Sequence, residues 1–183
     1  METASRLMTE RLTLEATRAE HGDPLWSAVR ASTAELRLWM PWAIDPSLQE
    51  TVAFAIAAEK RWGSGAQWNF TIIQDGDVIG SVGLDNHDAA VNACNLGYWL
   101  RSDRTGRGLM TEAAASVVKF GFDVVGLHRL ELRAAATNVA SQRVAEKLGF
   151  MREGLLRDGG RGAEGWHDSY LYALLSSDSS PHL

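Results

Sequence analysis

Short stretches in which apolar and polar residues alternate with a period of two run through the chain, as is typical of strands that bury one face. Two β-rich stretches, 68–73 and 78–84, flank Asp75-Gly76, a dipeptide that favours a tight hairpin turn. We therefore expect these two strands to pair antiparallel. Similar patterns predict the other strands at 11–15, 96–100, 130–134, 150–156 and 166–174. The last two are expected to form a terminal hairpin.

Other stretches repeat apolar residues every three or four positions, which predicts helices with one buried face. The clearest such helix runs from Leu109 to Val124, and Gly126 is expected to stop it. Its apolar stripe consists of Leu109, Ala113, Val117, Phe120 and Val124. This helix is expected to pack against a sheet.

Residues with known capping preferences mark the remaining helices. Asp23 followed by Pro24 predicts a helix over 24–32 with Asp23 as its N-cap. Ser47 with Glu50 forms a capping box, which predicts a helix that ends near 63–65. Asn138 is expected to cap a helix that runs to Leu148. The stretch 35–42 contains a proline near its end, so we expect a packed loop there.

The order of these elements predicts a mixed α/β fold in one domain, residues 1–175. The strands at 96–100 and 130–134 are joined by the long helix, so we expect them to be parallel neighbours with a right-handed crossover. Residues 176–183 are rich in serine and poor in apolar residues, which predicts a disordered tail.

Composition narrows the range of partners and compartments. The formal net charge of −5 makes nucleic-acid binding a poor hypothesis and suits a cationic acceptor. The N-terminus lacks the layout of a signal peptide, and no apolar run approaches the roughly 20 residues of a membrane span. We expect a cytoplasmic protein. Cys94 is the only cysteine, and we expect it to be a buried apolar residue without a catalytic role. No spacing of histidine, cysteine and carboxylates predicts a metal site.

A glycine-bearing basic turn lies between the strand at 96–100 and the long helix. The first N–H groups of a helix have no intrahelical partners and carry the positive end of its dipole, so a phosphate binds there readily. Gly106 and Gly108 allow close approach of the backbone to an anion, and Arg104 and Arg107 add positive charge. The turn is therefore a candidate anion cradle.

Three motifs in this order resemble the GNAT superfamily of acetyl-CoA-dependent N-acetyltransferases. They are Gly97-Tyr98-Trp99-Leu100, the run from Thr105 to Glu112, and Asn138 and Ser141 followed by Lys147-Leu148-Gly149-Phe150. The resemblance covers nearly the whole chain. It is strongest to the branch of ribosomal-protein N-terminal acetyltransferases, in which Trp39-Met40-Pro41-Trp42 also has counterparts. It implies a mixed α/β GNAT fold: a mostly antiparallel sheet with one splayed parallel pair, flanked by about four helices.

The resemblance also implies how acetyl-CoA binds. Its pyrophosphate would lie on backbone N–H groups of Gly106, Arg107, Gly108, Leu109, Met110 and Thr111. The pantetheine arm would enter between the splayed strands, where the Leu100 N–H would polarise the thioester carbonyl. Thr105 and Met110 differ from the usual motif, so Arg104 or Arg107 is expected to supply the missing charge.

For catalysis the resemblance implies direct attack by the amine, without an acyl-enzyme. Ser141, with Asn138 beside it, matches the position of a proton donor for the departing thiolate. Asp88 is the first candidate for the base, with His87 and Glu35 as alternatives, and water is a further possibility. Trp39, Trp42 and His87 are expected to line the acceptor pocket.

The acceptor is expected to be a protein or peptide N-terminus. An α-amine needs less help in losing its proton than a lysine, since its pKa is roughly 7.7–8.0 against about 10.4. A small amine such as a polyamine, an amino acid or an antibiotic is the alternative. A CoA-binding module without turnover is an alternative of another class, and a homodimer is a possible assembly.

Overall fold

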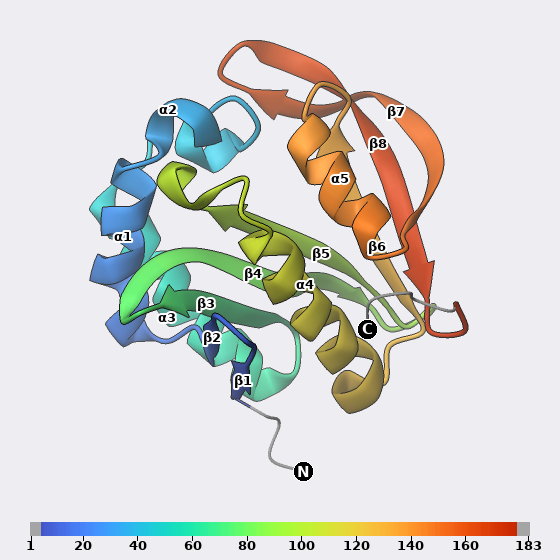
Figure 1. Cartoon of the computed structure of the whole chain (residues 1–183), viewed down its shortest axis with the longest axis horizontal. Helices are drawn as coiled ribbons and strands as arrows, with labels where there is room; N and C mark the ends of the chain where they lie inside the picture. The colour runs from blue at the N-terminus through green and yellow to red at the C-terminus, as the bar shows by residue number, and fades with distance from the viewer. Residues whose placement is uncertain (1–4, 179–183) are drawn as a thin grey trace.

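The alternating stretches form one twisted sheet. In the computed structural model, which describes residues 5–178, eight strands lie in the order β1-β2-β3-β4-β5-β6-β8-β7 (Figure 1). The strands are β1 (Arg6–Met8), β2 (Thr13–Ala16), β3 (Trp68–Gln74), β4 (Asp77–Asp88), β5 (Ala93–Leu100), β6 (Arg129–Ala135), β7 (Met151–Gly162) and β8 (Gly165–Leu175). Neighbours pair antiparallel except β5 and β6, which are parallel. The predicted mixed α/β fold is therefore confirmed.

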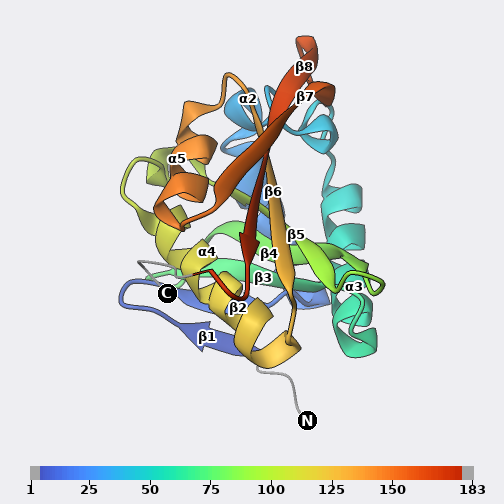
Figure 2. The same ribbon diagram turned by 90° about the vertical axis from the view of Figure 1, so that its right-hand side faces the viewer.

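Helices cover both faces of this sheet. They are α1 (Gly22–Arg30), α2 (Thr33–Leu36), α3 (Leu48–Ser64), α4 (Leu109–Phe120) and α5 (Val139–Lys147). Figure 2 shows α4 and α5 on one side of the sheet and α3 on the other, where α1 packs beside it. Within residues 5–178, no helix combines the length and the apolar content that crossing a membrane requires.

Several turn and cap signals place the elements as predicted. Ser47 caps α3: its Oγ accepts a hydrogen bond from the Glu50 N–H and donates one to the Glu50 carboxylate. Asp75 and Gly76 both have positive φ and close the β3–β4 hairpin. Gly126 adopts the left-handed conformation and ends the segment after α4. In each case the signal is local, so it survives in the folded chain.

Four local predictions are wrong in detail. Helix α1 starts at Gly22 with His21 as its N-cap, because a turn of 3-10 helix (Ala19–His21) precedes it and the His21 Nδ1 accepts the Arg18 N–H. The stretch 35–42, expected as a loop, includes the end of α2 and a 3-10 turn (Pro41–Ala43).

The other two corrections concern the ends of longer elements. Val124 is 47% exposed, because α4 ends at Phe120 and a wider π turn (Gly121–Val125) rotates the following side chains off the stripe. Strand β4 continues to Asp88 through a bulge, although 85–88 looks like a polar loop in the sequence. The short strand β1 was not predicted.

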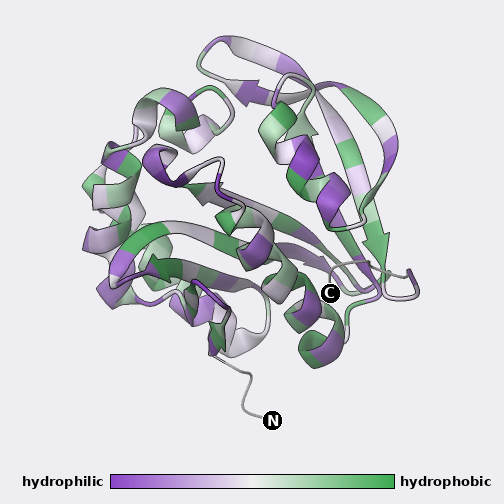
Figure 3. Cartoon of the chain, viewed as in Figure 1, coloured by the Kyte–Doolittle hydropathy of each residue, from purple (hydrophilic) through white to green (hydrophobic). Residues whose placement is uncertain are grey.

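The main core lies between α4 and the sheet. Leu109, Ala113, Val117 and Phe120 are each no more than 2% exposed. Figure 3 shows the polar turn that joins β5 to α4 at one end of this apolar layer. The fold therefore holds the start of α4 against the end of β5.

Strands β5 and β6 stay together over only three residue pairs, from Ala93–Arg129 to Asn95–Glu131. Beyond these pairs they diverge, and Figure 1 shows the opening between them with α4 and α5 on one side. The splayed parallel pair is therefore present, and it leaves one edge of β5 open from Leu96 to Leu100.

The chain remains ordered just beyond residue 175. The Ser176 N–H donates to the His128 carbonyl oxygen, and the Leu175 N–H donates to the Asp178 carboxylate. Ser176 and Asp178, at the start of the predicted tail, are thus hydrogen-bonded to the body of the protein, and residues 179–183 lie outside the described residues. The boundary of the domain at residue 175 stays a prediction.

Candidate active site

The turn between β5 and α4 has the backbone geometry of an anion cradle. Gly106 and Gly108 have φ of 74° and 77°, a conformation that other residues adopt only with strain. Gly108 is the N-cap of α4. Because glycine has no side chain, no N-cap side chain occupies the first N–H groups of the helix. Residues 105–108 are exposed. The backbone is therefore arranged to bind a phosphate.

A charged pair supports this turn from below. The Arg11 Nε donates to the Glu112 Oε2 at 2.7 Å, and the Arg11 Nη1 donates to the Arg107 carbonyl oxygen at 3.0 Å. The Thr9 hydroxyl and the Arg11 N–H both donate to the other oxygen of Glu112. Burial raises the pKa of Glu112, but these hydrogen bonds outweigh it and the net pKa is lowered. Arg11 thus links the start of α4 to the cradle.

We predict that Arg11→Ala weakens acetyl-CoA binding by about 5- to 30-fold, since a change of 1–2 kcal/mol corresponds to this range. The carbonyl of Arg107 would lose its donor and the turn would sample more conformations. The fold should lose only about 1–2 kcal/mol, because Arg11 is 43% exposed. Calorimetric titration with acetyl-CoA measures the first effect and thermal melting the second. An unchanged affinity would show that the turn holds its shape without Arg11.

The side chains around the cradle do not all face it. Arg104 turns to the β3–β4 hairpin, with its Nη1 3.3 Å from the Gln74 Oε1 and its Nη2 3.5 Å from the Asp77 Oδ2. Thr105 donates its hydroxyl to the Ser102 carbonyl. Arg107 remains exposed on the turn, so it is the better placed of the two predicted arginines.

The first residues of α4 contribute mainly through their backbone. Leu109 and Met110 are 1% and 9% exposed, and both side chains belong to the core. Thr111 is half-buried and lines a shallow hollow with Gly108 and with Lys147 of α5. This hollow extends the cradle between the two helices.

The register of β5 directs backbone groups into the splayed opening. The Arg101 N–H donates to the Ile79 carbonyl, so Gly80 and Leu100 face each other as a non-hydrogen-bonded pair. The N–H and C=O of Leu100 therefore point away from β4, towards the side from which β6 has diverged. By the same alternation those of Tyr98 point there too. This is where the Leu100 N–H was predicted to act.

Two hydroxyl groups meet across this opening. The Tyr98 Oη, from β5, lies 2.9 Å from the Ser141 Oγ, from the first turn of α5. Burial raises the pKa of Tyr98 to about 12, with the Ser141 hydrogen bond partly opposing it. Asn138 caps α5 by accepting the Ser141 N–H. Asn138 thus has a structural role, since it binds the backbone of Ser141. The Ser141 hydroxyl is free to pair with Tyr98.

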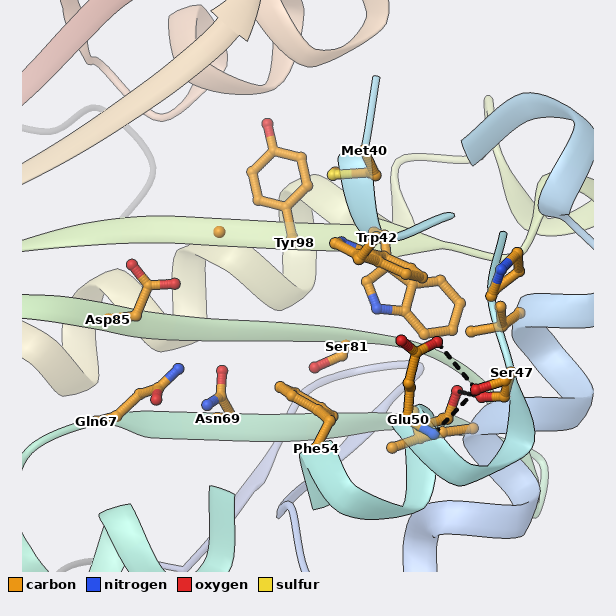
Figure 4. Close-up of a pocket in the computed structure, with 16 residues that line it drawn as sticks. Met40, Trp42, Ser47, Glu50, Phe54, Gln67, Asn69, Ser81, Asp85 and Tyr98 are labelled. Atoms are coloured by element: carbon orange, nitrogen blue, oxygen red, sulfur yellow. Dashed lines mark hydrogen bonds between the residues drawn. The ribbon is translucent and has the colours of Figure 1, made fainter. Parts of the chain in front are cut away.

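A cavity of about 500 Å³ lies on the opposite face of the sheet, between β3–β5 and the α1–α3 layer. Figure 4 shows Asn69, Ser81 and Asp85 on its floor, Phe54 and Glu50 from α3, and Trp42 and Met40 from the segment before α3. Its remaining lining residues are Leu25, Val29, Pro46, Ser47, Thr51, Gln67, Gly97, Tyr98 and Trp99. Tyr98 belongs to the lining and also contacts Ser141, so the cavity and the splayed opening meet at β5.

Asp85 is the ionisable group on the floor of this cavity. Burial raises its pKa, and a hydrogen bond with Asn95 partly opposes the shift. Its Oδ2 lies 3.6 Å from the point that a Cβ on Gly97 would occupy, so the carboxylate leans over Gly97. Tyr98, the next residue after Gly97 on β5, lies at the opening. The Asp85 carboxyl group, with its raised pKa, is therefore close to the opening.

The residues predicted as bases lie elsewhere. Asp88 is exposed at the end of β4 and accepts the Ala90 N–H. His87 is exposed and lies near Asn92 and the ring of Trp68. Glu35 accepts the Ser102 hydroxyl and so ties α2 to the turn after β5. None of these three side chains lines the cavity.

Of the two predicted pocket tryptophans, one is in the cavity. Trp42 lines it and lies 5.9 Å from the ring of Trp99. Trp39 instead lies against His167 of β8, 6.4 Å between ring centroids, and is not part of the lining. The 3-10 turn at Pro41 separates the directions of the two rings.

Asp85 and Tyr98 were missed as candidates. Ser81, Gly83 and Asp85 occupy alternate positions of β4 and share a face, so a polar and small-residue face was the available signal. No local signal links Tyr98 to Ser141, which is 43 residues away. Cys94 is 2% exposed, and burial raises the pKa of its thiol to about 12. Among residues 5–178, no cluster of three or more His, Cys, Asp or Glu is arranged to hold a metal.

Comparison with known proteins agrees with this geometry. A family model described as an acetyltransferase (GNAT) domain matches residues 11–151. The [ribosomal protein uS5]-alanine N-acetyltransferase of Escherichia coli is 26% identical over 96% of this chain and 93% of its own length. The ribosomal-protein-serine acetyltransferase of the same organism is 23% identical over 92% and 94%.

A solved structure of similar fold contains CoA. RimJ of Mycobacterium smegmatis, in complex with CoA-disulfide, superposes with a TM-score of 0.83 and is 26% identical, covering 92% of this chain and 85% of that one. The family model spans most of the chain, including the cradle and β5. The chain belongs to the GNAT family of acetyltransferases.

Proposed function

We propose that the protein transfers the acetyl group of acetyl-CoA to the α-amine of a protein or peptide N-terminus. The observation that supports this most is the two-sided site at β5. The cradle, the Leu100 backbone and the Tyr98–Ser141 pair lie along the splayed opening. The cavity with Asp85 lies on the other face and meets the opening at Tyr98. Donor and acceptor can thus approach one point from opposite sides.

The glycine turn and the opening fit the shape and charge of acetyl-CoA. The backbone N–H groups of residues 106–111 would hold its pyrophosphate, with the exposed Arg107 as the nearby cation. The Leu100 N–H points into the opening and would donate to the thioester carbonyl. When bound, acetyl-CoA supplies an activated acyl group for attack by an amine.

The remaining steps are proton movements that this chain's side chains perform. The Asp85 carboxylate would accept a proton from the acceptor's ammonium group, directly or through one water. The raised pKa of Asp85 makes its carboxylate a stronger base than an ordinary aspartate. The Tyr98–Ser141 pair, neutral at physiological pH, would donate a proton to the departing thiolate, and the second proton that the attacked amine nitrogen loses would restore the pair.

The charge of the cavity lining supports an N-terminal amine as the acceptor. The described lining has two carboxylates, Asp85 and Glu50, and has no lysine or arginine. An α-amine, with a pKa of roughly 7.7–8.0, needs only modest help to become neutral. The two E. coli relatives are named for alanine and serine of ribosomal proteins. We therefore propose a protein of the ribosome as the physiological acceptor, and a homodimer as the assembly.

Release of CoA thiol in the presence of acceptors tests this function. We expect acetyl-CoA to be consumed with peptides that begin with alanine or serine, and mass spectrometry should place the acetyl group on the α-amine. Turnover only with polyamines, amino acids or aminoglycosides would favour the small-amine alternative. Binding of CoA without turnover over the whole panel would favour a binding module, and light scattering checks the assembly.

A further inference from the structure

Asn69 has a buried amide group that the fold leaves unpaired. It lies on β3, is 7% exposed and belongs to the floor of the acceptor cavity (Figure 4). Its Nδ2 is buried and has no hydrogen-bond partner among residues 5–178. Buried polar groups without partners are uncommon because their desolvation is not compensated. An amide in this condition on a cavity floor suggests that a ligand supplies the partner.

Two glycines near Asn69 leave space for this amide, because they have no side chains. Gly83 and Gly97 face each other across β4 and β5. A Cβ on Gly83 would lie 2.2 Å from the Asn69 Oδ1, and a Cβ on Gly97 would lie 3.6 Å from the Asp85 Oδ2. The amide and the carboxylate therefore approach the same glycine pair from two sides. The Nδ2 is buried in this conformation, and rotation about the soft terminal amide torsion would bring it to the cavity.

Other hydroxyl groups of the cavity lining are already used inside the protein. Ser81 donates to the Phe70 carbonyl, Ser47 donates to Glu50, and Thr51 donates to the Ser47 carbonyl. Asp85, when ionised, can only accept hydrogen bonds. A ligand that brings both an amine and a neighbouring carbonyl group would find an acceptor in Asp85 and a free donor in Asn69.

We infer that Asn69 is a specificity-determining residue, whose side-chain amide donates a hydrogen bond to the carbonyl oxygen next to the acceptor's amine. This inference rests on the proposed function and narrows it. The acceptor would be an α-amino acyl amide, as at a peptide N-terminus, because there the carbonyl carbon of the first residue is bonded directly to the carbon that carries the α-amine. A polyamine or simple alkylamine lacks this carbonyl and would leave the Asn69 donor unpaired.

The test compares two acceptors in wild type and Asn69→Leu. One acceptor is a peptide that begins with alanine, and the other is isopropylamine, which has no carbonyl. We expect Asn69→Leu to lower kcat/KM for the peptide by about 10- to 100-fold and to leave that for isopropylamine nearly unchanged. Comparing the ratios between variants cancels the different reactivities of the two amines. Asn69→Ala repeats the comparison in case leucine does not pack.

Thr71→Val is the matched control. Thr71 lies two residues further along β3 on the same face, outside the cavity lining, and its hydroxyl is 3.0 Å from that of Thr17. This substitution should lower the melting temperature, because the Thr17 hydroxyl loses its partner, and should leave the acceptor ratio unchanged. Asn69→Leu should keep or raise the melting temperature, because it removes an unpaired buried donor.

The outcomes separate the inference from the function on which it rests. If the wild type acetylates the peptide and Asn69→Leu does so equally well, the role of Asn69 is wrong and the function stands. An equal loss with both acceptors also contradicts it, since a general loss of geometry would explain that. If the wild type acetylates no peptide while it binds acetyl-CoA, the proposed function fails and the inference falls with it.

Discussion

Asp85→Asn is expected to lower kcat/KM for a peptide acceptor by about 10²- to 10⁴-fold, the range that general base catalysis contributes. Asparagine keeps the shape of the side chain and removes its ability to take a proton. The affinity for acetyl-CoA should not change, because Asp85 lies on the cavity face of the sheet and not along the cradle. Steady-state kinetics with a peptide and calorimetry with acetyl-CoA separate the two effects.

The activity should depend on pH in a defined direction if Asp85 is the base. The base must be ionised, and burial raises the pKa of Asp85. Activity limited by Asp85 is therefore lost as the pH falls through a value above that of an ordinary aspartate. In Asp85→Asn this dependence should disappear, and only the titration of the acceptor's own amine should remain. A peptide series with different amine pKa values distinguishes the two titrations.

Folding stability should change in the opposite direction from activity. Because the folded-state pKa of Asp85 is raised, the folded protein binds a proton more readily than the unfolded chain does. Its contribution to stability is present at low pH and is lost as the pH rises through the folded pKa. Above its folded-state pKa the ionised Asp85 thus costs stability, and Asp85→Asn should melt there at the same or a higher temperature. Loss of activity by unfolding is thereby excluded.

Asp88→Asn is the competing variant. Asp88 was the first candidate from the sequence, but it is exposed and accepts a backbone N–H at the end of β4. If Asp88 is the base, the large loss falls on this variant and Asp85→Asn stays active. If both variants keep the activity of the wild type, water is the proton acceptor, as the low pKa of an α-amine permits.

The contrast between these two carboxylates shows what the sequence can and cannot predict. Residues 85–88 are all polar, so in the sequence they look like the loop that ends a hairpin. In the structure a bulge between Asp85 and Asp88 lets β4 continue, and pairing with β5 fixes which side chains face the cavity. The alternation of Ser81, Gly83 and Asp85 was visible, but its meaning depends on where the strand ends.

The fold was predicted well because its signals are local. The capping pair Ser47–Glu50 and the turn Asp75-Gly76 act within a few residues, and the stripe of α4 needs only helical periodicity. The cradle belongs to the same class, since Gly106 and Gly108 serve it through their own backbone conformation. Its support by Arg11 joins residues about 100 positions apart, and nothing in either segment alone indicates that contact.

The largest expected effect on the donor side concerns Tyr98 and Ser141. We predict that Tyr98→Phe and Ser141→Ala each lower kcat by about 10²-fold, at the lower end of what acid–base groups contribute. Their hydroxyls are 2.9 Å apart, so whichever one donates to the thiolate is oriented by the other. The affinity for acetyl-CoA should change little, because in the proposed site the turn at Gly106–Gly108 would make the phosphate contacts.

The double variant decides whether the two hydroxyls act together. If they form one proton-donating unit, Tyr98→Phe with Ser141→Ala should cost about as much as either change alone, since the first removal already breaks the unit. Multiplying losses would instead mean that the residues act separately, for example with Tyr98 as the donor and Ser141 only packing at the start of α5. An unchanged kcat in both single variants, measured where chemistry limits the rate, would mean that Ser141 has only a structural role in the first turn of α5. Solvent would then protonate the thiolate. Because Tyr98 has a pKa of about 12, its neutral form persists over the pH range in which the Asp85 carboxylate is ionised, so one site can hold an acid and a base at the same pH.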